Sequence, residues 1–146
     1  MPLTLMPPEK ALVALLNDTD ETLALLSGRI YPYQAEYEAT YPLVLYNRTE
    51  SEYFDALAGL SYDNLTRVSI ELNYHADSYS GCKSGAVIIR NALSAYSGLV
   101  ETETERLTFN RIRHIDERDG FLDPDKGRTN GIYGVIQEYE LWYLNE

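Results

Sequence analysis

The segment that most restricts the fold is residues 65–79, LTRVSIELNYHADSY, in which apolar and polar side chains alternate. This alternation has a period of two, which is typical of a strand that buries one face and leaves the other polar. His75 belongs to the polar side. The apolar side of the predicted strand consists of Val68, Ile70, Leu72 and Tyr74.

Helical periodicity is found in two segments. The first begins at Pro7-Pro8-Glu9, since proline is tolerated in the first turn and an acidic group there suits the helix dipole. After an interruption at residues 18–20, a short second turn is predicted to run to Leu26 and to end at Ser27-Gly28. The apolar stripe of the first segment is Ala11, Leu12, Leu15 and Leu16.

The second helix is predicted to follow residues 65–79 directly. Asp77 or Ser78 is expected to cap its start, and Gly98 to end it. Its apolar residues recur at intervals of four and three, as on an amphipathic helix: Cys82, Ala86, Ile89, Leu93 and Tyr96.

Further extended segments are expected at residues 29–32, 43–52, 107–112 and 133–144. Leu107 and Phe109 share one face whereas Ile112 falls on the other, so a bulge is predicted near Asn110-Arg111. The connections are expected to be residues 33–41, residues 54–64 and a charged loop over residues 116–131.

These elements predict an α+β fold: an antiparallel β-sheet of four or five strands with two α-helices packed on one face. A length of 146 residues suits one domain, 1–146. No apolar stretch approaches the roughly 20 residues needed to span a bilayer, so no membrane partner is expected. The N-terminus lacks the pattern of a signal peptide, which predicts a protein made and used without export.

The charge restricts the possible partners. A formal net charge of -11 repels phosphate backbones, which argues against a protein that grips nucleic acid. DNA that passes by without specific binding remains compatible with this charge. The expected surface is acidic throughout.

A catalytic role has one candidate region. The residue types of a hydrolase occur at His75, Asp77, Ser78, Ser80 and Cys82. However, Asp77 and Ser78 have a sufficient purpose as helix caps, and Cys82 lies on an apolar stripe. A hydrolase using His75 is therefore the least favoured alternative. No cofactor-binding motif is present, and no catalytic residue is predicted.

Metal binding is also disfavoured. His114 is the only other histidine, and neither a His-x-x-x-His nor a Cys-x-x-Cys motif occurs. Residues 123–127, DPDKG, resemble the start of a calcium loop but lack its glycine and closing glutamate positions. Acidic residues 116, 117 and 119 are expected to belong to a solvated loop.

Thirteen tyrosines against three phenylalanines are unusual, and tyrosine suits half-buried strands and protein interfaces. The last strand has apolar residues on both faces, which indicates contact with another chain. The candidate contact residues for self-association or partner binding are Tyr37, Tyr41, Tyr53, Phe54, Tyr139, Trp142 and Tyr143.

The order of elements along nearly the whole chain resembles the tail-completion, or tail-to-head joining (tail terminator), proteins of long-tailed phages. The resemblance is carried by LLSGRIYP at residues 25–32, YPLVLY at 41–46, the strand at 67–74, the helix through 86–93 and a β-rich last third. The long segment 116–131 and the extra tyrosines depart from the family pattern.

This resemblance implies a structural virion protein with no catalytic residues. It implies a ring, of six copies in the family, that terminates the tail tube in the phage neck and joins it to the head connector, with DNA passing through. The implied partners are other copies of the chain, the tail-tube protein and the head-completion protein, and assembly would take place in the host cytoplasm. A small non-catalytic interaction adaptor of similar fold stays open as the alternative.

Overall fold

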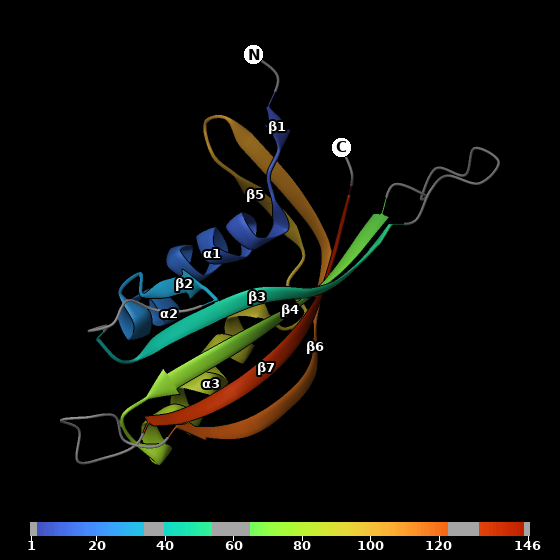
Figure 1. Cartoon of the computed structure of the whole chain (residues 1–146). Coiled ribbons are helices and arrows are strands. Elements are labelled where there is room, and N and C mark those ends of the chain that lie inside the picture. The colour runs from blue at the N-terminus through green and yellow to red at the C-terminus, as the bar shows by residue number, and fades with distance from the viewer. Residues whose placement is uncertain (1–2, 34–39, 54–64, 123–131, 145–146) are drawn as a thin grey trace.

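The structure is a computed structural model that describes residues 3–33, 40–53, 65–122 and 132–144. A seven-stranded sheet with the order β1-β6-β7-β4-β3-β2, and with β5 paired to β6, forms its centre (Figure 1). The strands are β1 (Thr4–Leu5), β2 (Ile30–Pro32), β3 (Leu43–Tyr53), β4 (Leu65–Ala76), β5 (Gly98–Glu101), β6 (Glu105–Leu122) and β7 (Ile132–Leu144). The helices are α1 (Pro8–Asp18), α2 (Asp20–Leu26) and α3 (Tyr79–Leu93).

The prediction of an antiparallel sheet of four or five strands with two helices was wrong. The sheet is mixed, because β1 pairs with β6 and β2 pairs with β3 in parallel, and it curls into a half-barrel with three helices. Strand β2 lies within the extended segment expected at residues 29–32. Strands β1 and β5 have only two and four residues, too few to show an alternating pattern. The interruption near Thr19 divides the first helical segment into two separate helices.

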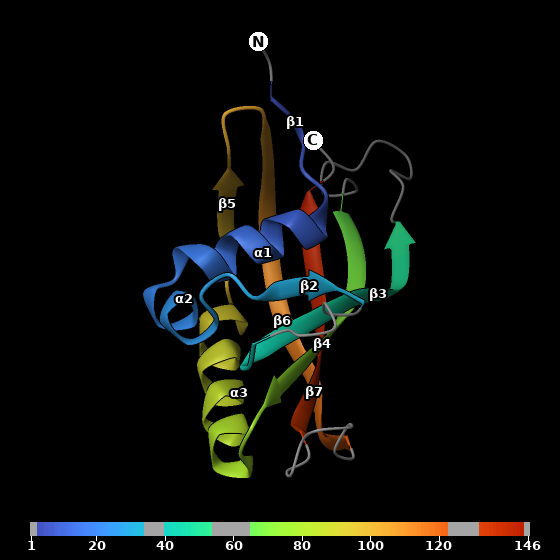
Figure 2. The same cartoon turned by 60° about the vertical axis from the view of Figure 1, so that its left-hand side comes forward.

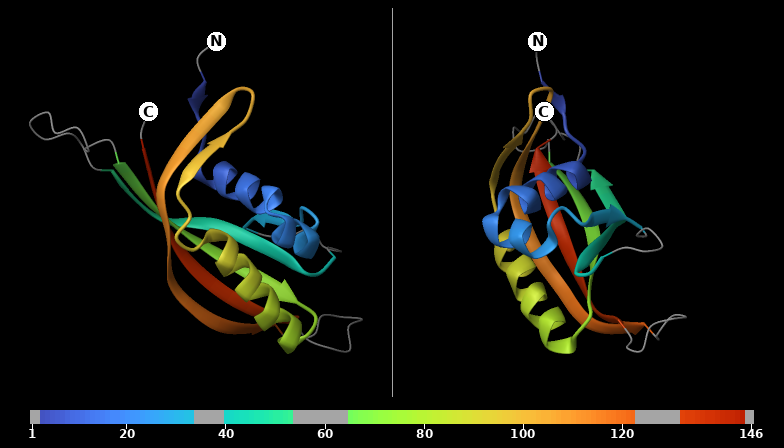
Figure 3. Two further views of the ribbon diagram at one scale, coloured as in Figure 1. Left: turned by 180° about the vertical axis from the view of Figure 1, so that it is seen from behind. Right: turned by 90° about the vertical axis from the view of Figure 1, so that its left-hand side faces the viewer.

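Bulges explain the curl of the sheet, because an extra residue on one strand bends it and increases its twist. The register of β6 against β7 shifts between Phe109 and Arg111, which confirms the bulge predicted there, and shifts again between His114 and Asp116. Strand β3 has a similar shift between Arg48 and Glu50. The views from two further directions show the resulting curvature of β6 and β7 (Figures 2 and 3).

The prediction of a charged loop over residues 116–131 was wrong for residues 116–122. Residues 116–122 continue β6, which is 18 residues long, and residues 123–131 lie outside the described part of the chain. The charged side chains are accommodated in the strand because several pair with cations of neighbouring elements. Arg90 of α3, for example, reaches Glu117, and Lys83 of the same helix forms an ion pair with Asp119.

The helices lie on one face of the sheet, which we call the helix face (Figure 3). The predicted stripes of α1 and α3 are buried there with the apolar side of β4. Ser78 caps α3 as predicted, since its Oγ accepts a hydrogen bond from the Gly81 N–H at 3.0 Å. The helix ends at Leu93, earlier than the expected end at Gly98, because the chain turns at Ala95, whose φ is +63°.

Helix α3 approaches the sheet very closely at Gly85. A Cβ atom added there would lie 2.2 Å from the hydroxyl oxygen of Tyr74, so only glycine leaves room for this buried ring.

A buried polar cluster lies next to this contact between α3 and the sheet. Gln137 Nε2 donates to the Ala86 carbonyl oxygen at 2.9 Å and to Glu117 Oε1 at 2.8 Å, while the Tyr139 hydroxyl donates to Gln137 Oε1 at 3.0 Å. These bonds tie α3, β6 and β7 together.

Candidate interaction surface

The opposite side of the sheet, which we call the open face, is covered by no helix of the described residues (Figures 1 and 3). It is formed by the central strands β3, β4, β7 and β6. Because neighbouring residues of a strand point to opposite faces, the register places a band of charged side chains on it. They are Glu50 and Glu52 of β3, Arg67 and Glu71 of β4, Glu138 and Glu140 of β7, and Arg111, Arg113, Asp116 and Arg118 of β6.

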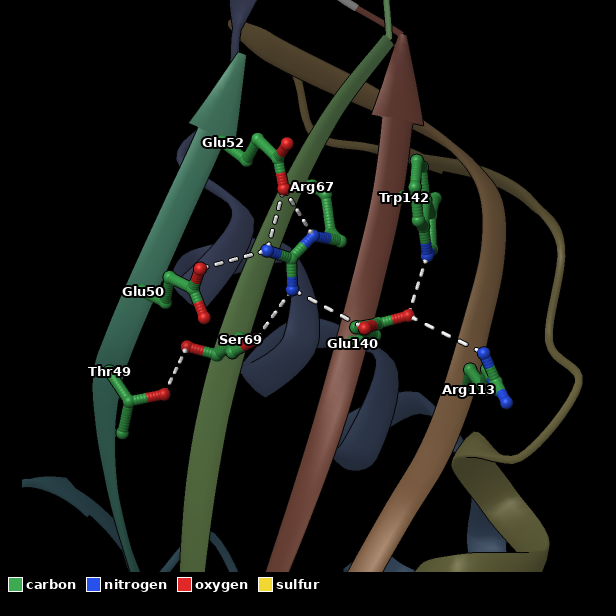
Figure 4. Close-up of polar contacts among 8 residues, drawn as sticks. All are labelled: Thr49, Glu50, Glu52, Arg67, Ser69, Arg113, Glu140 and Trp142. Atoms are coloured by element: carbon green, nitrogen blue, oxygen red, sulfur yellow. Dashed lines mark hydrogen bonds and ion pairs between the residues drawn. The ribbon is translucent and has the colours of Figure 1, made fainter. Parts of the chain in front are cut away.

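Arg67 is the centre of this band (Figure 4). Its Nη2 donates to Glu52 Oε2 at 2.8 Å and to Glu50 Oε1 at 3.0 Å, and its Nη1 donates to Glu140 Oε2 at 3.3 Å. Its side chain is only 12% exposed, because these three carboxylates surround it. The hydrogen bond to Glu52, with those to the other carboxylates, raises the pKa of the Arg67 guanidinium. One cation is therefore shared by three acids.

Glu140 extends the same network toward β6. Its Oε1 accepts a hydrogen bond from the Trp142 indole Nε1–H at 3.0 Å and lies 4.0 Å from Arg113 Nη1. The indole ring is thereby held on the open face, where it is half-buried. The polar contacts of Figure 4 run without a break from β3 to β6.

A second row of charges crosses the sheet further along the strands. Glu71, Glu138 and Asp116 lie opposite one another on β4, β7 and β6. Adjacent like charges of this kind destabilise a sheet. Arg118 offsets the repulsion, since its Nη1 is 3.3 Å from Asp116 Oδ2 and its Nη2 is 3.6 Å from Glu71 Oε2.

The two edges of the open face carry opposite charge. Strand β6 contributes three arginines and one carboxylate, whereas β3, β4 and β7 together contribute five carboxylates and one arginine. Arg111 is exposed and makes no ion pair with any of the described residues. The face is thus basic along β6 and acidic along β3.

The residues considered for hydrolysis lie apart. His75 is on the open face, packed beside Gly134, and burial lowers the pKa of its imidazole. Cys82 is in the core on the helix face, where burial raises the pKa of its thiol to about 11 and its Sγ–H contacts the Tyr74 carbonyl oxygen at 3.8 Å. The Ser78 hydroxyl oxygen is occupied as a helix cap. The sheet separates His75 from Cys82, so these two do not form a nucleophile–base pair.

No group of three or more potential metal ligands occurs among the described residues. Asp116 pairs with Arg118, and Asp119 pairs with Lys83. His114 lies against the Tyr139 ring, with a centroid distance of 5.2 Å. Residues 123–127, with the partial calcium-loop pattern, are outside the described part of the chain. None of the described helices combines the length and hydrophobicity that crossing a bilayer requires.

The predicted contact residues have different locations. Tyr37 and Phe54 lie outside the described residues, Tyr41 is half-buried before β3, and Tyr53 is the last residue of β3. Tyr139 and Tyr143 are buried on the helix face, with 0% and 4% exposure, whereas Trp142 lies on the open face. Of the three aromatic residues predicted on β7, Trp142 is the one whose side chain lies on the open face. Sequence reasoning missed the arginines of β6, although their recurrence at 111, 113 and 118 was visible.

Comparison with known proteins identifies the family. The family model described as tail completion protein gp17 matches residues 10–143 of the chain. The chain belongs to this family. As a tail completion protein, it is a structural component of a phage-type virion.

A solved structure described as the virion of a native gene transfer agent particle is similar to this tail completion protein, with a TM-score of 0.68. The alignment covers 93% of each chain at 11% sequence identity, so the likeness concerns the fold. No curated protein matches the sequence.

Proposed function

We propose that this tail completion protein forms a ring, of six copies, that terminates the tail tube in the phage neck and joins it to the head connector. The observation that carries the proposal is the open face, whose continuous charged network is built from four strands. A closed ring requires that one patch of each subunit meet a different patch of the next. A face that is basic at one edge and acidic at the other satisfies that requirement.

The proposed ring is a non-catalytic conduit. Its partners are other copies of the chain, the tail-tube protein and the head-completion protein. The net charge of -11 supports passage of DNA without binding, since a protein that holds DNA gains affinity by neutralising phosphates with Lys and Arg. A bore lined with Lys or Arg would contradict this part of the proposal.

Native mass spectrometry tests the ring directly. The full chain is measured alone and after addition of purified tails that lack it, and the expected species is a closed oligomer of about six copies. A chain that stays monomeric under both conditions, and instead binds one protein from outside the virion, would support the adaptor alternative and overturn the proposal.

Trp142→Ala is expected to weaken ring formation more than it lowers the stability of the monomer. The indole is half-buried on the open face and is bonded to Glu140, so its loss alters the proposed contact surface while the helix face stays packed. The matched control is Leu23→Ala on α2, a residue 44% exposed on a different surface. Ring formation that is equally unaffected by both changes would exclude β7 from the contact.

A further inference from the structure

We propose that neighbouring copies join through two different surfaces: Tyr33, just after β2 of one copy, packs on the apolar end of the open face of the next. This inference rests on the proposed ring and names the surfaces that build it. The apolar end is defined by five residues from β1, β4, β5 and β7, which are Leu5, Leu65, Leu99, Trp142 and Leu144.

The apolar end continues the open face beyond its charged band. Strand pairing places Leu65 opposite Leu144, and Leu99 opposite Thr108 of β6. Leu144 lies at the level of Thr108, one step beyond the last registered pair of β6 and β7, so the four residues form one row across the sheet. A residue next to each of them in the chain is buried on the helix face, so the row belongs to the open face.

The side chains of the apolar end are accessible. Leu99 is 51% exposed, and Leu5, which pairs with Arg106, is 41% exposed. Trp142 is half-buried in the next row of the open face, opposite Arg111. No helix of the described residues covers this side of the sheet (Figures 1 and 3). An exposed apolar patch with charged residues around it is typical of a protein contact.

Two cations border the apolar end. Arg106 and Arg111 are exposed, and neither forms an ion pair with a described residue. The apolar end therefore fits an occupant that presents an apolar side chain together with carboxylates. Another copy of the chain is a source of such a surface, since its net charge is -11.

Tyr33 has the properties of this occupant. It is 74% exposed, the highest value among the large apolar side chains of the described residues. Its φ is +59°, which is unfavourable for a bulky residue, and its N–H donates to the Tyr46 carbonyl oxygen at 2.9 Å. Strained backbone of this kind is found preferentially at functional positions. An aromatic side chain on a fixed backbone also loses little conformational entropy when it binds.

The sequence after Tyr33 supplies the carboxylates. Residues 34–41, QAEYEATY, contain two glutamates and no Lys or Arg, and residues 34–39 among them lie outside the described part of the chain. Two negative charges close in sequence to an exposed aromatic residue complement the two arginines that border the apolar end.

The two surfaces lie far apart in one copy. Tyr33 is bonded to Tyr46, whereas the apolar end lies at the level of Glu52 and beyond, six residues further along β3 and roughly 20 Å away. This distance exceeds the length of a tyrosine side chain, so Tyr33 does not cover the apolar end of its own copy. A contact between two different surfaces repeats from copy to copy, as a ring requires, whereas contact of the apolar end with itself would stop at a dimer.

Photocrosslinking tests this contact in the full chain. p-Benzoylphenylalanine, which attaches to nearby C–H groups on illumination, replaces Tyr33, and rings verified by native mass spectrometry are illuminated. Each copy then carries one probe and one acceptor surface, so denaturing electrophoresis is expected to show dimers, trimers and higher species. Peptide mass spectrometry should locate the attachment in the peptides that contain Leu99, Trp142 or Leu144.

The same probe at position 79 is the matched control. Tyr79 is also an exposed tyrosine, at 52%, but it belongs to α3. It should give no attachment to the apolar end. If the probe at position 33 attaches to the helices of the neighbour, or to the tail-tube protein in rings assembled on tails, the inference is overturned while the ring itself stands.

Tyr33→Gly separates the contact from folding. Glycine adopts a positive φ without strain, so the monomer should be no less stable than the unmodified monomer. Loss of the aromatic side chain should weaken self-association by about tenfold or more. Val87→Ala on α3, at a residue 42% exposed, should leave association unchanged. A Tyr33→Gly chain that associates as strongly as the unmodified chain would contradict the proposed contact.

Mixing two variants tests whether the two surfaces differ. Tyr33→Gly lacks one surface and Trp142→Ala lacks the other, so a mixture retains one intact pair and should form one-to-one dimers but no ring. Sedimentation velocity measures this at a concentration at which neither variant assembles alone. A mixture that assembles no further than either variant would contradict the inference. If the unmodified chain itself forms no ring, the proposed function fails first.

Discussion

The two faces of β4 and β7 share one backbone but hold the molecule together in different ways. On the helix face, Ile70 and Tyr139 have 0% exposure and pack with the helices. On the open face, Arg67 and Glu140 are joined by charged hydrogen bonds and have no layer of the described chain above them. Within the described residues, the helix face is covered by the helices, whereas the open face carries exposed charges at its edges.

Because of this difference, the two faces are expected to contribute to different processes, the helix face to folding and the open face to assembly. Burial of apolar side chains is the main favourable contribution to folding, at roughly 25 cal/mol per Å² of buried area. Exposed ion pairs contribute typically less than about 1 kcal/mol each, although they fix which surfaces meet. We therefore expect substitutions on the helix face to change stability and substitutions on the open face mainly to change association.

The largest effect is expected from Ile70→Ala. Removing this buried side chain leaves a cavity in the helix face and should lower the free energy of unfolding by about 2–5 kcal/mol. The neighbouring change Glu71→Ala, on the open face, should alter it by no more than about 0.5 kcal/mol. Urea unfolding followed by circular dichroism measures both. Equal losses would remove the distinction between the faces.

Gln137→Ala should have the next largest effect, a loss of about 1–3 kcal/mol. The change leaves the buried Tyr139 hydroxyl without its acceptor and removes the bond to the Ala86 carbonyl oxygen of α3. Tyr139→Phe removes only one of these bonds and serves as the graded comparison. If Gln137→Ala lowers the free energy of unfolding by less than Tyr139→Phe does in the same measurement, the hydrogen bonds of Gln137 do not stabilise the packing of α3 on β7.

Arg67→Met should lower stability by about 1 kcal/mol at low salt, because three carboxylates are left near one another without their shared cation. The methionine retains the apolar contacts of the arginine stem. Added salt screens the remaining repulsion, so the difference from the unmodified chain should shrink in 1 M NaCl. A difference that salt leaves unchanged would show that packing, and not charge, dominates at this position.

The smallest effect is expected on the pH dependence of stability, through His75. Burial lowers the pKa of His75, so the folded chain binds a proton less readily than the unfolded chain, whose imidazole has a pKa of about 6.5. This histidine therefore costs no stability above that pH and reduces stability as the pH falls below it. His75→Gln should make the loss between pH 7.5 and 5.5 smaller than in the unmodified chain. An identical loss of stability in the variant and the unmodified chain would show that His75 does not contribute to this pH dependence.

Periodicity within the sequence was sufficient to predict α3, the apolar side of β4, and the bulge at Asn110-Arg111, because each depends on residues close together in the chain. Strand β1 depends on a partner far away in the sequence, since it is a strand only because Thr4 and Leu5 pair with β6. The charged network of the open face could not be predicted from the sequence for the same reason. Arg67 meets Glu52 and Glu140, which are 15 and 73 residues away, and no local pattern connects them.

Electron cryomicroscopy of the assembled oligomer tests the central claim most directly. The claim is that the open face of the sheet carries the contact between successive copies. The expected map shows the charged side chains of the open face and the Trp142 indole at the boundary with a neighbouring subunit. A map in which subunits meet through α1 and α3 while the open face is exposed to solvent would contradict the account.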